Sequence, residues 1–498
     1  MEYTSTRNNQ IRVTAAQAIA TGISPEGGLY VPTALPQLSL DDIRALVPLS
    51  YKERATKILS HFLTDFTAEE VQECCESAYG ERFDTPAIAP MHDMGDGRHI
   101  LELWHGPTCA FKDMALQILP HIMRVSVSKT NPDEQIVILV ATSGDTGKAA
   151  LEGFRDAKNT RILVFYPAEG VSEMQRFQMI TQEGNNVSVC AIDGNFDDAQ
   201  TGVKSIFTDE DVKNKLADNG MRFSSANSIN WGRLVPQIVY YISAYCDLLA
   251  ENKIEAGESI NVVVPTGNFG NILACYYAKC MGLPVNKLIC ASNRNRILTD
   301  FFETGVYDCH RPFYTTTSPS MDILVSSNLE RLLYHLCGDN SDEIAELMSA
   351  LKNDKKYVVS DVLRSALQQD FVGGSADDAQ VAATIRSVFE QSGYLCDTHT
   401  AVAVTVYDDY RTKTGDETPT VIASTASPFK FAPSILEALG AELADTPYDQ
   451  LADLQAVTGW KTPQPLASLR DKEIRFTGGC SNDKASMQAT VYRMLKLD

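Results

Sequence analysis

Short apolar runs that end in small or polar residues recur through the middle of the chain. They lie at Ile136–Val140, Ile162–Phe165, Val187–Ile192 and Val262–Val264, each before a glycine-containing turn sequence. Apolar runs of this length between turn signals are typical of strands that are buried on both faces. Val421–Ser424 has the same character. We therefore predict a strand at each of these five places.

Amphipathic stretches long enough for helices separate several of these runs. Gly147–Lys158, Asp197–Ile206 and Phe269–Met281 are the clearest of them. Repetition of strand, loop and helix predicts α/β layers around a mainly parallel sheet, because parallel neighbours need a crossover connection. The polar sequences Asp370–Asp378 and Thr412–Thr418, in contrast, predict loops.

The ends of the chain differ from this middle part. Leu40–Leu46 and Tyr51–Leu63 have helical patterns, and a GGLYVP segment precedes them between Gly27 and Pro32. The 498 residues also exceed one ordinary core of about 150 residues. We predict an N-terminal domain at 1–95, a core at 96–431 with a smaller subdomain at about 130–230, and a C-terminal extension of helices and a final strand at 432–498.

Composition narrows the class of protein. No apolar run reaches about 18 residues, and the polar start Met1–Gln10 lacks the apolar core of a secretory signal, so we expect a soluble cytoplasmic protein. A net charge of -21 opposes binding to nucleic acid or anionic membranes, although an anionic small molecule remains compatible with it. The twelve cysteines include no CxxC pair, which argues against a zinc ribbon or a thioredoxin-like motif.

The first chemical motif is HGPTCAFKD, from His105 to Asp113. The apolar stretch Met114–Leu119 that follows predicts a helix, which places Lys112 near its N-terminus. The helix dipole there disfavours a protonated amine and so favours a nucleophilic one that can form an imine. A solvated lysine is the alternative interpretation, since the chain has 43 lysines and arginines.

Two further motifs follow predicted strands and contain small residues that let backbone N–H groups approach an anion. ATSGDTG, from Ala141 to Gly147, offers such amides together with hydroxyls and predicts a site for a substrate carboxylate. Lys148 follows it, but the GxxxxGK[ST] spacing of a P-loop is absent. PTGNFGN, from Pro265 to Asn271, predicts a phosphate cradle, and a purely structural turn is the alternative.

The fourth motif is STASPFKF, from Ser424 to Phe431. A hydroxyl at the carboxyl end of a strand points into the crevice where α/β folds bind ligands. Thr425, with Ser424 in reserve, is therefore a candidate neutral partner for a pyridine nitrogen. A neutral partner suits elimination and replacement chemistry better than an aspartate does, because it leaves the ring a weaker electron sink.

Together with EGGLYVP and SSANSINWGRL (Ser224–Leu234), these motifs resemble the threonine synthase family, within the tryptophan-synthase β-like group of pyridoxal-phosphate enzymes. The likeness covers nearly the whole chain and keeps the order of the family's motifs. It implies an α/β fold of pyridoxal-phosphate type II, with two open, mainly parallel sheets, helices on both faces and an N-terminal domain. It also implies the cofactor pyridoxal 5′-phosphate and conversion of O-phospho-L-homoserine and water into L-threonine and phosphate, by a monomer or a homodimer.

The resemblance also implies roles for the residues whose letters match. Lys112 would hold the cofactor as a Schiff base and act as the proton shuttle. The cofactor-binding set would be Lys112, Gly267, Asn268, Phe269, Asn271 and Thr425, the last at the pyridine nitrogen. The carboxylate-binding set would be Thr142, Ser143, Gly144 and Thr146, with Asp145 beside the cofactor's O3′. The substrate phosphate would meet Ser225, Asn227, Asn230 and Arg233.

One motif departs from the family pattern. The family often shows DPHTA, whereas this chain has Asp397-Thr398-His399-Thr400-Ala401. Loss of the proline relaxes the backbone there, so we assign no catalytic role to His399 and expect a structural histidine with satisfied hydrogen bonds. Two other functions stay open: a related phospholyase that acts on another phosphorylated amino compound, and a catalytically silent protein of the same fold.

Overall fold

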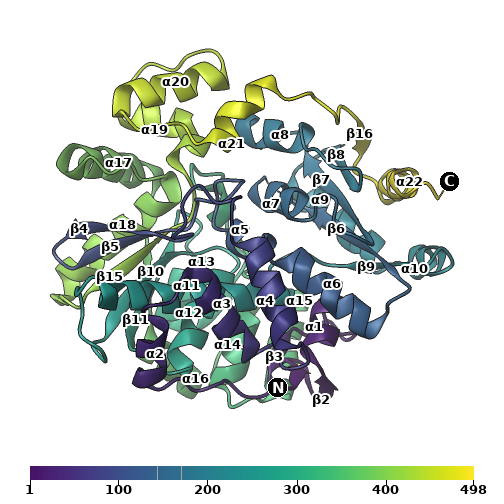
Figure 1. Ribbon diagram of the computed structural model, residues 1–498, viewed down its shortest axis with the longest axis horizontal. Helices are drawn as coiled ribbons and strands as arrows, with labels where there is room; N and C mark the ends of the chain where they lie inside the picture. Colours follow the sequence, from purple (N-terminus) through teal and green to yellow (C-terminus); the bar gives the residue numbers. More distant parts are fainter. Residues whose placement is uncertain (143, 170, 498) are drawn as a thin grey trace.

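Two open sheets form the body of the molecule (Figure 1). The computed structural model describes residues 1–142, 144–169 and 171–497. The larger sheet, in the order β14-β11-β10-β15-β5-β4, contains β4 (Met91–Gly95), β5 (Arg98–Glu102), β10 (Ile260–Pro265), β11 (Val285–Ser292), β14 (Phe371–Ser375) and β15 (Thr420–Ser424). The smaller sheet, in the order β16-β8-β7-β6-β9, contains β6 (Gln135–Ala141), β7 (Thr160–Pro167), β8 (Val187–Asp193), β9 (Met221–Ser224) and β16 (Gly479–Ser481).

Both sheets confirm the predicted α/β class. Every strand pair within them is parallel except β4 with β5. The five predicted strands are β6, β7, β8, β10 and β15, and all residues of β10 and β15 are buried. This burial explains their apolar sequences, because helices cover parallel sheets on both faces.

The loop predicted at Asp370–Asp378 is wrong. Its first half is β14, which pairs with β11 in parallel register. A Cβ on Gly373 would lie 2.8 Å from the Cα of Thr299, and one on Gly374 would lie 2.4 Å from a methyl carbon of Val406. Glycine therefore lets this edge strand pack closely between two helices, and its glycine-rich, polar sequence hid the strand.

Helices cover the sheets and join them. The first are α1 (Ala15–Thr21), α2 (Leu40–Leu46), α3 (Tyr51–Ser60), α4 (Ala68–Ala78), α5 (Asp113–Leu116), α6 (Leu119–Thr130), α7 (Asp145–Gly153), α8 (Glu173–Ile180), α9 (Phe196–Phe207), α10 (Glu210–Ala217) and α11 (Trp231–Ala250). The others are α12 (Gly270–Cys280), α13 (Ile297–Thr304), α14 (Leu329–Leu336), α15 (Ser341–Asp354), α16 (Asp361–Asp370), α17 (Asp378–Ser392), α18 (Thr398–Thr414), α19 (Ala432–Ala438), α20 (Pro447–Thr458), α21 (Gln464–Ala467) and α22 (Lys484–Leu495). Short 3-10 turns lie at η1 (Pro319–Met321), η2 (Pro428–Phe431) and η3 (Ser468–Asp471).

Most predicted helices match these bounds within a few residues. The helix predicted at Gly147–Lys158 is α7, which starts at Asp145 and ends at Gly153. It stops early because Asp156 and Asn159 adopt positive φ angles of 55° and 53°, outside the right-handed helical region.

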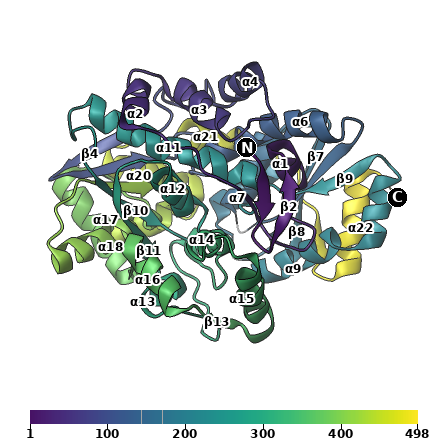
Figure 2. The ribbon, with the colours of Figure 1, turned by 90° about the horizontal axis from the view of Figure 1, so that it is seen from below.

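The N-terminal region packs directly on α11, the long buried helix at the centre of the molecule. Helices α2 and α3 pack on it, and α4 packs on α3 and α6; Figure 2 shows these helices from below. Strands β1 (Tyr3–Ser5), β2 (Asn8–Val13) and β3 (Tyr30–Pro32) add a small antiparallel sheet that the sequence did not predict. The ring of Tyr3 lies 5.4 Å from that of Trp231, at the start of α11. The predicted boundary at residue 95 falls between the paired strands β4 and β5.

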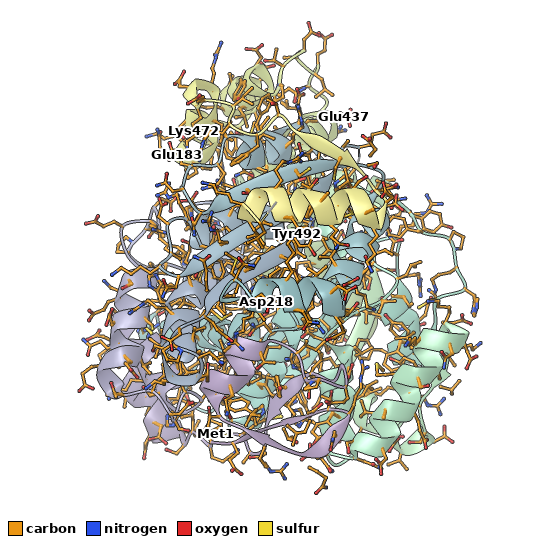
Figure 3. All side chains as sticks on the ribbon, turned by 90° about the vertical axis from the view of Figure 1, so that its right-hand side faces the viewer. Met1, Glu183, Asp218, Glu437, Lys472 and Tyr492 are labelled. Atoms are coloured by element: carbon orange, nitrogen blue, oxygen red, sulfur yellow. The ribbon has the colours of Figure 1, made fainter. Side chains whose placement is uncertain are left out.

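The C-terminal segment contacts both sheets. Helix α19 packs against α17 beside the larger sheet, and Arg475 then donates from its guanidinium to the carbonyl of Gln182, 2.6 Å away. Strand β16 joins the edge of the smaller sheet, and α22, which carries Tyr492, lies across that sheet in Figure 3. The expected final strand is therefore followed by one more helix. Within the described ranges, no helix is long and apolar enough to span a membrane.

Candidate functional site

Four of the sequence motifs meet at the carboxyl ends of the strands, between the two sheets. The lysine segment runs antiparallel to the segment after β15: the backbone N–H of Phe111 donates to Thr425, 2.8 Å away, and that of Ser427 donates to Cys109, 3.0 Å away. A β-bridge joins Ala110 and Ala426 between them. Parallel strands bring their carboxyl ends to one edge, so segments distant in sequence share one crevice there.

The loop that carries Lys112 is closed by Asp113. Its buried carboxylate accepts hydrogen bonds from the backbone N–H and the hydroxyl of Thr108, each 2.8 Å long. A Cβ on Gly106 would lie 2.5 Å from the same carboxylate, so only glycine leaves room for this closure. Burial raises the pKa of Asp113 to about 6, against the effect of the two hydrogen bonds. The loop thus fixes the residue just before Asp113.

Lys112 is a largely buried amine, and its side chain is 13% exposed. Its Nζ lies 3.3 Å from the Ser320 hydroxyl and 3.7 Å from a carboxylate oxygen of Asp145. Burial lowers the pKa of Lys112 to about 8; Asp145 opposes this shift, and Lys430 and Arg233 add to it. The sequence attributed the effect to a helix dipole, but α5 has only four residues, and burial is the main cause.

Asp145 lies at the centre of a cluster of charged residues that also contains Lys112, Lys430 and Arg233, which we call the charged half of the site. One of its oxygens lies 2.6 Å from Nζ of Lys430 and accepts a hydrogen bond of 2.9 Å from the Gln175 amide. The other accepts from the Ser320 hydroxyl at 3.4 Å. Burial raises the pKa of Asp145, but the positive charges of Lys430 and Lys112 outweigh burial and hold this pKa well below its usual range. Asp145 is therefore an anion at neutral pH.

Sequence reasoning missed three of these contacts. Lys430 lies in the quoted STASPFKF motif, and a lysine between two phenylalanines was a signal for a buried, paired charge. Gln175, on α8, and Ser320, in η1, belong to no motif. Only the tertiary fold brings these two residues to Asp145.

The turn between β6 and α7 is tied by Thr142. The Thr142 hydroxyl accepts from the backbone N–H groups of Gly144 and Gly147, at 3.0 and 2.8 Å. Gly144 has a φ of +136°, and a Cβ there would lie 2.5 Å from the Gln175 side chain. The N–H groups of Asp145 and Thr146 have no acceptor among the described residues, so both can bind a ligand carboxylate. Ser143, predicted for the same task, lies outside the described residues.

The turn between β10 and α12 has the form of an anion cradle. The backbone N–H groups from Gly267 through Asn271 have no acceptor in the described part of the chain. A Cβ on Gly267 would lie 2.5 Å from the carbonyl oxygen of Ser320, so a side chain would fill this space. Phe269 adopts a left-handed φ of 64° and buries its ring, which turns the chain into the helix. Backbone amides at a helix N-terminus favour a phosphate.

The asparagines of this turn hold it in place. The Asn271 amide donates to the carbonyl of Pro265 at 3.2 Å, and its own oxygen accepts from the N–H of Ile272. The backbone carbonyl of Asn268 accepts from the N–H and the side-chain amide of Asn328, at 3.1 and 2.9 Å. These contacts leave the backbone as the part of the turn that faces a ligand.

The two hydroxyls after β15 differ in their surroundings. The Ser424 hydroxyl accepts from the indole N–H of Trp104 at 3.0 Å and from the Thr400 hydroxyl at 2.9 Å. For the Thr425 hydroxyl, no partner is found among the described residues, and its side chain is nearly buried. Of the two, Thr425 is therefore the hydroxyl that is free for a ligand.

The segment from Ser225 to Arg233 divides into structural and free groups. Asn230 caps α11: its oxygen accepts from the N–H of Gly232, and its amide donates to the carbonyls of Ile19 and Ser225. Arg233 is buried; it donates to the carbonyl of Ala226, and its Nε has no partner within the described residues. Burial lowers the pKa of Arg233 to about 10. A buried guanidinium with an unused donor indicates an anion-binding position.

Asn227 and Ser225 complete this part of the site. The Ser225 hydroxyl accepts from the N–H of Asn227 at 3.1 Å. The Asn227 amide has no side-chain partner in the described ranges, and its residue is only partly buried. Both lie in the short connection between β9 and α11, next to Arg233.

His399 holds the loop that carries Ser320. Its Nε2 accepts from the N–H of Ser320 at 3.2 Å, which requires the ring hydrogen on Nδ1, and Asp397 lies 2.9 Å from that atom. Both ring nitrogens are thus satisfied, as expected for a structural histidine. The carboxylate of Asp322, held by the amides of Asn293 and Asn295 at 2.7 and 3.0 Å, fixes the same loop. Ser320 is therefore held over Lys112.

Family comparisons agree with this architecture. A family model described as Pyridoxal-phosphate dependent enzyme matches residues 99–425. Models described as Threonine synthase N terminus and Threonine synthase, C-terminal match residues 2–79 and 400–491. The N-terminal model therefore matches first along the chain, the pyridoxal-phosphate model second and the C-terminal model last.

Individual relatives include threonine synthases and proteins of a related name. The threonine synthase of Pseudomonas aeruginosa is 41% identical over 91% of this chain and 93% of its own. The human protein Threonine synthase-like 1 is 43% identical over 88% of this chain, and the chain spans 59% of that relative's length.

Solved structures of the same name share the fold. The structure of pyridoxal-phosphate-bound threonine synthase from Brucella melitensis has a TM-score of 0.88 and 36% identity, over 99% of both chains. Yeast threonine synthase has a TM-score of 0.88 and 30% identity, also over 99% of both. The site fits the cofactor, because it combines a buried amine, a cradle of free amides and a free hydroxyl. The chain therefore belongs to the threonine synthase family of pyridoxal-phosphate-dependent enzymes, with the type II fold and with pyridoxal 5′-phosphate as its cofactor.

Proposed function

We propose that this chain converts O-phospho-L-homoserine and water into L-threonine and phosphate. The observation that carries the proposal is the buried guanidinium of Arg233, whose Nε has no partner among the described residues. Arg233 is close enough to Lys112 to lower its pKa. A cation with a free donor beside a nucleophilic amine suits a substrate that carries both an amine and a phosphate.

For cofactor binding, we propose roles for three parts of the site. The Lys112 amine binds the aldehyde, the free amides from Gly267 to Asn271 bind the phosphate, and the Thr425 hydroxyl meets the ring nitrogen. When bound, pyridoxal phosphate supplies a conjugated ring that delocalises negative charge from the carbon next to the substrate amine. The neutral Thr425 hydroxyl does not protonate the ring nitrogen as an aspartate would, so the ring is a weaker electron sink.

Lys112 is the proposed acid and base. The reaction removes a proton from the carbon next to the amine and another from the adjacent carbon before phosphate leaves. An amine with a pKa of about 8 can accept a proton at neutral pH and return it later in the same turnover. The Ser320 hydroxyl, 3.3 Å from Nζ, restricts the directions that the amine can take.

The charged half of the site is proposed to bind the substrate. The free amides of Asp145 and Thr146 face a carboxylate, with the turn held by Thr142 and Gly144. Arg233, Ser225 and Asn227 are proposed to face the substrate phosphate. Asn230 keeps them in place as the cap of α11, since its side-chain groups are all engaged.

A related phospholyase acting on another phosphorylated amino compound is the second candidate. The human relative named Threonine synthase-like 1 is as similar to this chain as the threonine synthase of Pseudomonas aeruginosa is, at 43% and 41% identity. A free guanidinium accepts any phosphate monoester, so Arg233 fits this candidate too. A catalytically silent protein is disfavoured, because such a protein has no physical need for an unpaired buried arginine beside a buried lysine.

The deciding assay measures phosphate release from O-phospho-L-homoserine and identifies threonine in the same tube. Threonine formed in equal amount to phosphate supports the proposal, and phosphate release without threonine supports the phospholyase. Lys112→Ala is expected to lower turnover by roughly 10³-fold or more, because the nucleophile and the base are lost together. Lys129→Ala, which removes a partly exposed lysine paired with Glu70, is the matched control and should retain turnover. Full activity in Lys112→Ala would refute the assignment.

A further inference from the structure

We propose that Lys430 is a positioning residue, which occupies the carboxylate of Asp145 and thereby keeps the Lys112 amine free of a tight ion pair. The proposal rests on the proposed role of Lys112 and does not depend on which phosphorylated substrate the enzyme takes.

Lys430 is fully buried, and two oxygens surround its charge. Its side chain is 0% exposed, its Nζ lies 2.6 Å from an oxygen of Asp145, and it donates to the carbonyl of Thr108 at 2.9 Å. A buried ammonium is costly unless it is paired and hydrogen-bonded. Flanking phenylalanines, Phe429 and Phe431, are also buried and hold this turn against the core. The position therefore places the Lys430 ammonium directly beside the Asp145 carboxylate.

Asp145 is shared unequally between two lysines. The oxygen that faces Lys430 lies 2.6 Å from its Nζ, whereas the oxygen that faces Lys112 lies 3.7 Å from that Nζ. Coulomb attraction weakens with distance, so Asp145 interacts more strongly with Lys430 than with Lys112. If the charge of Lys430 is removed, Asp145 has one remaining cationic neighbour within these contacts, and it can close on Lys112. A lysine held in such a pair stays protonated and is a poor nucleophile.

The other charged groups nearby do not replace Lys430. Lys112 faces Asp145, Lys430 and Arg233, and Arg233 also acts to lower the pKa of Lys112. Asp113 faces Lys430 as well, but both its oxygens already accept from Thr108. Removal of the Lys430 charge thus removes a cation that repels the protonated Lys112. It also leaves the Asp145 carboxylate without its nearer cationic partner, so Asp145 can interact more strongly with Lys112. Both changes favour the protonated amine.

The test is the pH dependence of two properties that require no substrate. One is the visible absorbance of the holoenzyme, which reports protonation at the nitrogen of Lys112, and the other is the rate at which the apoenzyme captures pyridoxal phosphate. Lys430→Gln should move both midpoints upward by about one pH unit, the usual size for a charge partner within about 4–6 Å. Asp145→Asn should move both midpoints downward, because it removes the carboxylate that attracts the protonated amine.

A matched control separates this effect from loss of a buried ion pair in general. Lys148 is also buried, and it pairs with Glu152 at 3.2 Å on the same helix as Asp145. Lys148→Gln should lower thermal stability without moving either midpoint. Lys430→Arg, which keeps the charge, should stay within a few tenths of a pH unit of the unchanged protein.

Opposite shifts in Lys430→Gln and Asp145→Asn are the result expected. An unchanged or lowered midpoint in Lys430→Gln would overturn the proposal. Should that variant fail to fold, Asp145→Asn alone decides, since an unchanged or raised midpoint there contradicts the sharing of Asp145. Both readouts are spectroscopic, so absence of threonine synthesis would overturn the proposed function and leave this inference intact.

Discussion

The two turns that lead from a strand into a helix at this site solve different problems. The turn from β10 into α12 has no charged side chain from Pro265 to Asn271 and offers only backbone amides. The turn from β6 into α7 places Asp145 at the first helical position, between Lys430 and Lys112. Neutral amides are proposed to hold an anion that stays in place. Charges are concentrated instead where protons are proposed to move.

The contrast extends to the backbone. Phe269 adopts a left-handed φ of 64°, which is uncommon for a bulky residue and costs about 1–2 kcal/mol, whereas Gly144 adopts a φ of +136° that is open mainly to glycine. The turn from β10 into α12 also needs a glycine, because a Cβ on Gly267 would lie 2.5 Å from the carbonyl oxygen of Ser320. The turn from β6 into α7 depends on Gly144, because the Gln175 side chain, a partner of Asp145, occupies the space of a Cβ, and on Gly147, whose Cβ would lie 2.3 Å from the Thr142 side chain.

Of the changes that test this comparison, filling the turn from β10 into α12 should have the largest effect. Gly267→Val should weaken cofactor affinity by about a hundredfold, because its Cβ would meet the Ser320 carbonyl at 2.5 Å and overpacking of this kind costs about 1–3 kcal/mol. Gly270→Ala is the control; its Cβ would lie 3.6 Å from its nearest neighbour, an ordinary contact, and affinity should stay within a few fold. Equilibrium titration of the apoproteins with pyridoxal phosphate measures both. Equal cofactor affinities of the two variants would contradict the proposal that this turn binds the cofactor phosphate.

The charged half should affect the substrate more than the cofactor. Arg233→Met should raise KM for the phosphorylated substrate by about 10- to 30-fold, which is the lower part of the range expected for hydrogen bonds to charged groups, worth about 1.5–3 kcal/mol. Cofactor affinity should change little, and Arg233→Lys should recover part of the loss. Steady-state kinetics on cofactor-saturated enzyme give the comparison. A change in cofactor affinity with KM unaltered would contradict the division of tasks.

A smaller effect is expected at the hydroxyls after β15. Thr425→Val removes a hydroxyl that has no partner in the described ranges, so stability should hold while turnover falls by a few fold. Ser424→Ala breaks the contacts with Trp104 and Thr400 and should instead lower stability by about 1 kcal/mol. Thermal melts and turnover of both variants separate the two roles. Reversed behaviour would exchange the assignments of Thr425 and Ser424.

The smallest effect concerns stability at the rim of the lysine segment. Burial opposes the charge of His105, but the carboxylates of Asp84 and Glu102, 2.6 and 2.8 Å away, outweigh it and raise the pKa of His105 to about 9. A pKa raised on folding stabilises the protein fully below the unfolded value of 6.5 and loses this contribution as pH rises through about 9. His105→Gln should therefore cost about 1 kcal/mol near pH 6 and almost nothing above pH 9. Chemical denaturation at both extremes checks this, and a cost that is independent of pH would argue against a charged His105.

Much of the fold was readable from the sequence because buried parallel strands have distinctive apolar runs. All five predicted strands are present, whereas β14 was missed because close packing against Thr299 and Val406 required glycines that are typical of loops. The small N-terminal sheet was also missed. Its edge strand β2 is partly exposed, so its sequence lacks a buried pattern.

The sequence predicted the motifs of the site but not the hydrogen bonds and ion pairs that join them. The four motifs lie at strand ends and meet as parallel topology requires, and the assigned roles of their residues remain predictions. The partners of Asp145 were not predicted, because Gln175 and Ser320 carry no local signal and their contacts arise from long-range folding. The buried position of Lys430 was signalled only by its aromatic neighbours.

Reduction of the holoenzyme with borohydride, followed by peptide mapping, tests the central claim most directly. Two lysines contact Asp145, and only one of them is proposed to bind the aldehyde. The account predicts that the reduced cofactor is found on the peptide that contains Lys112. Label on Lys430, or on no lysine at all, would contradict it.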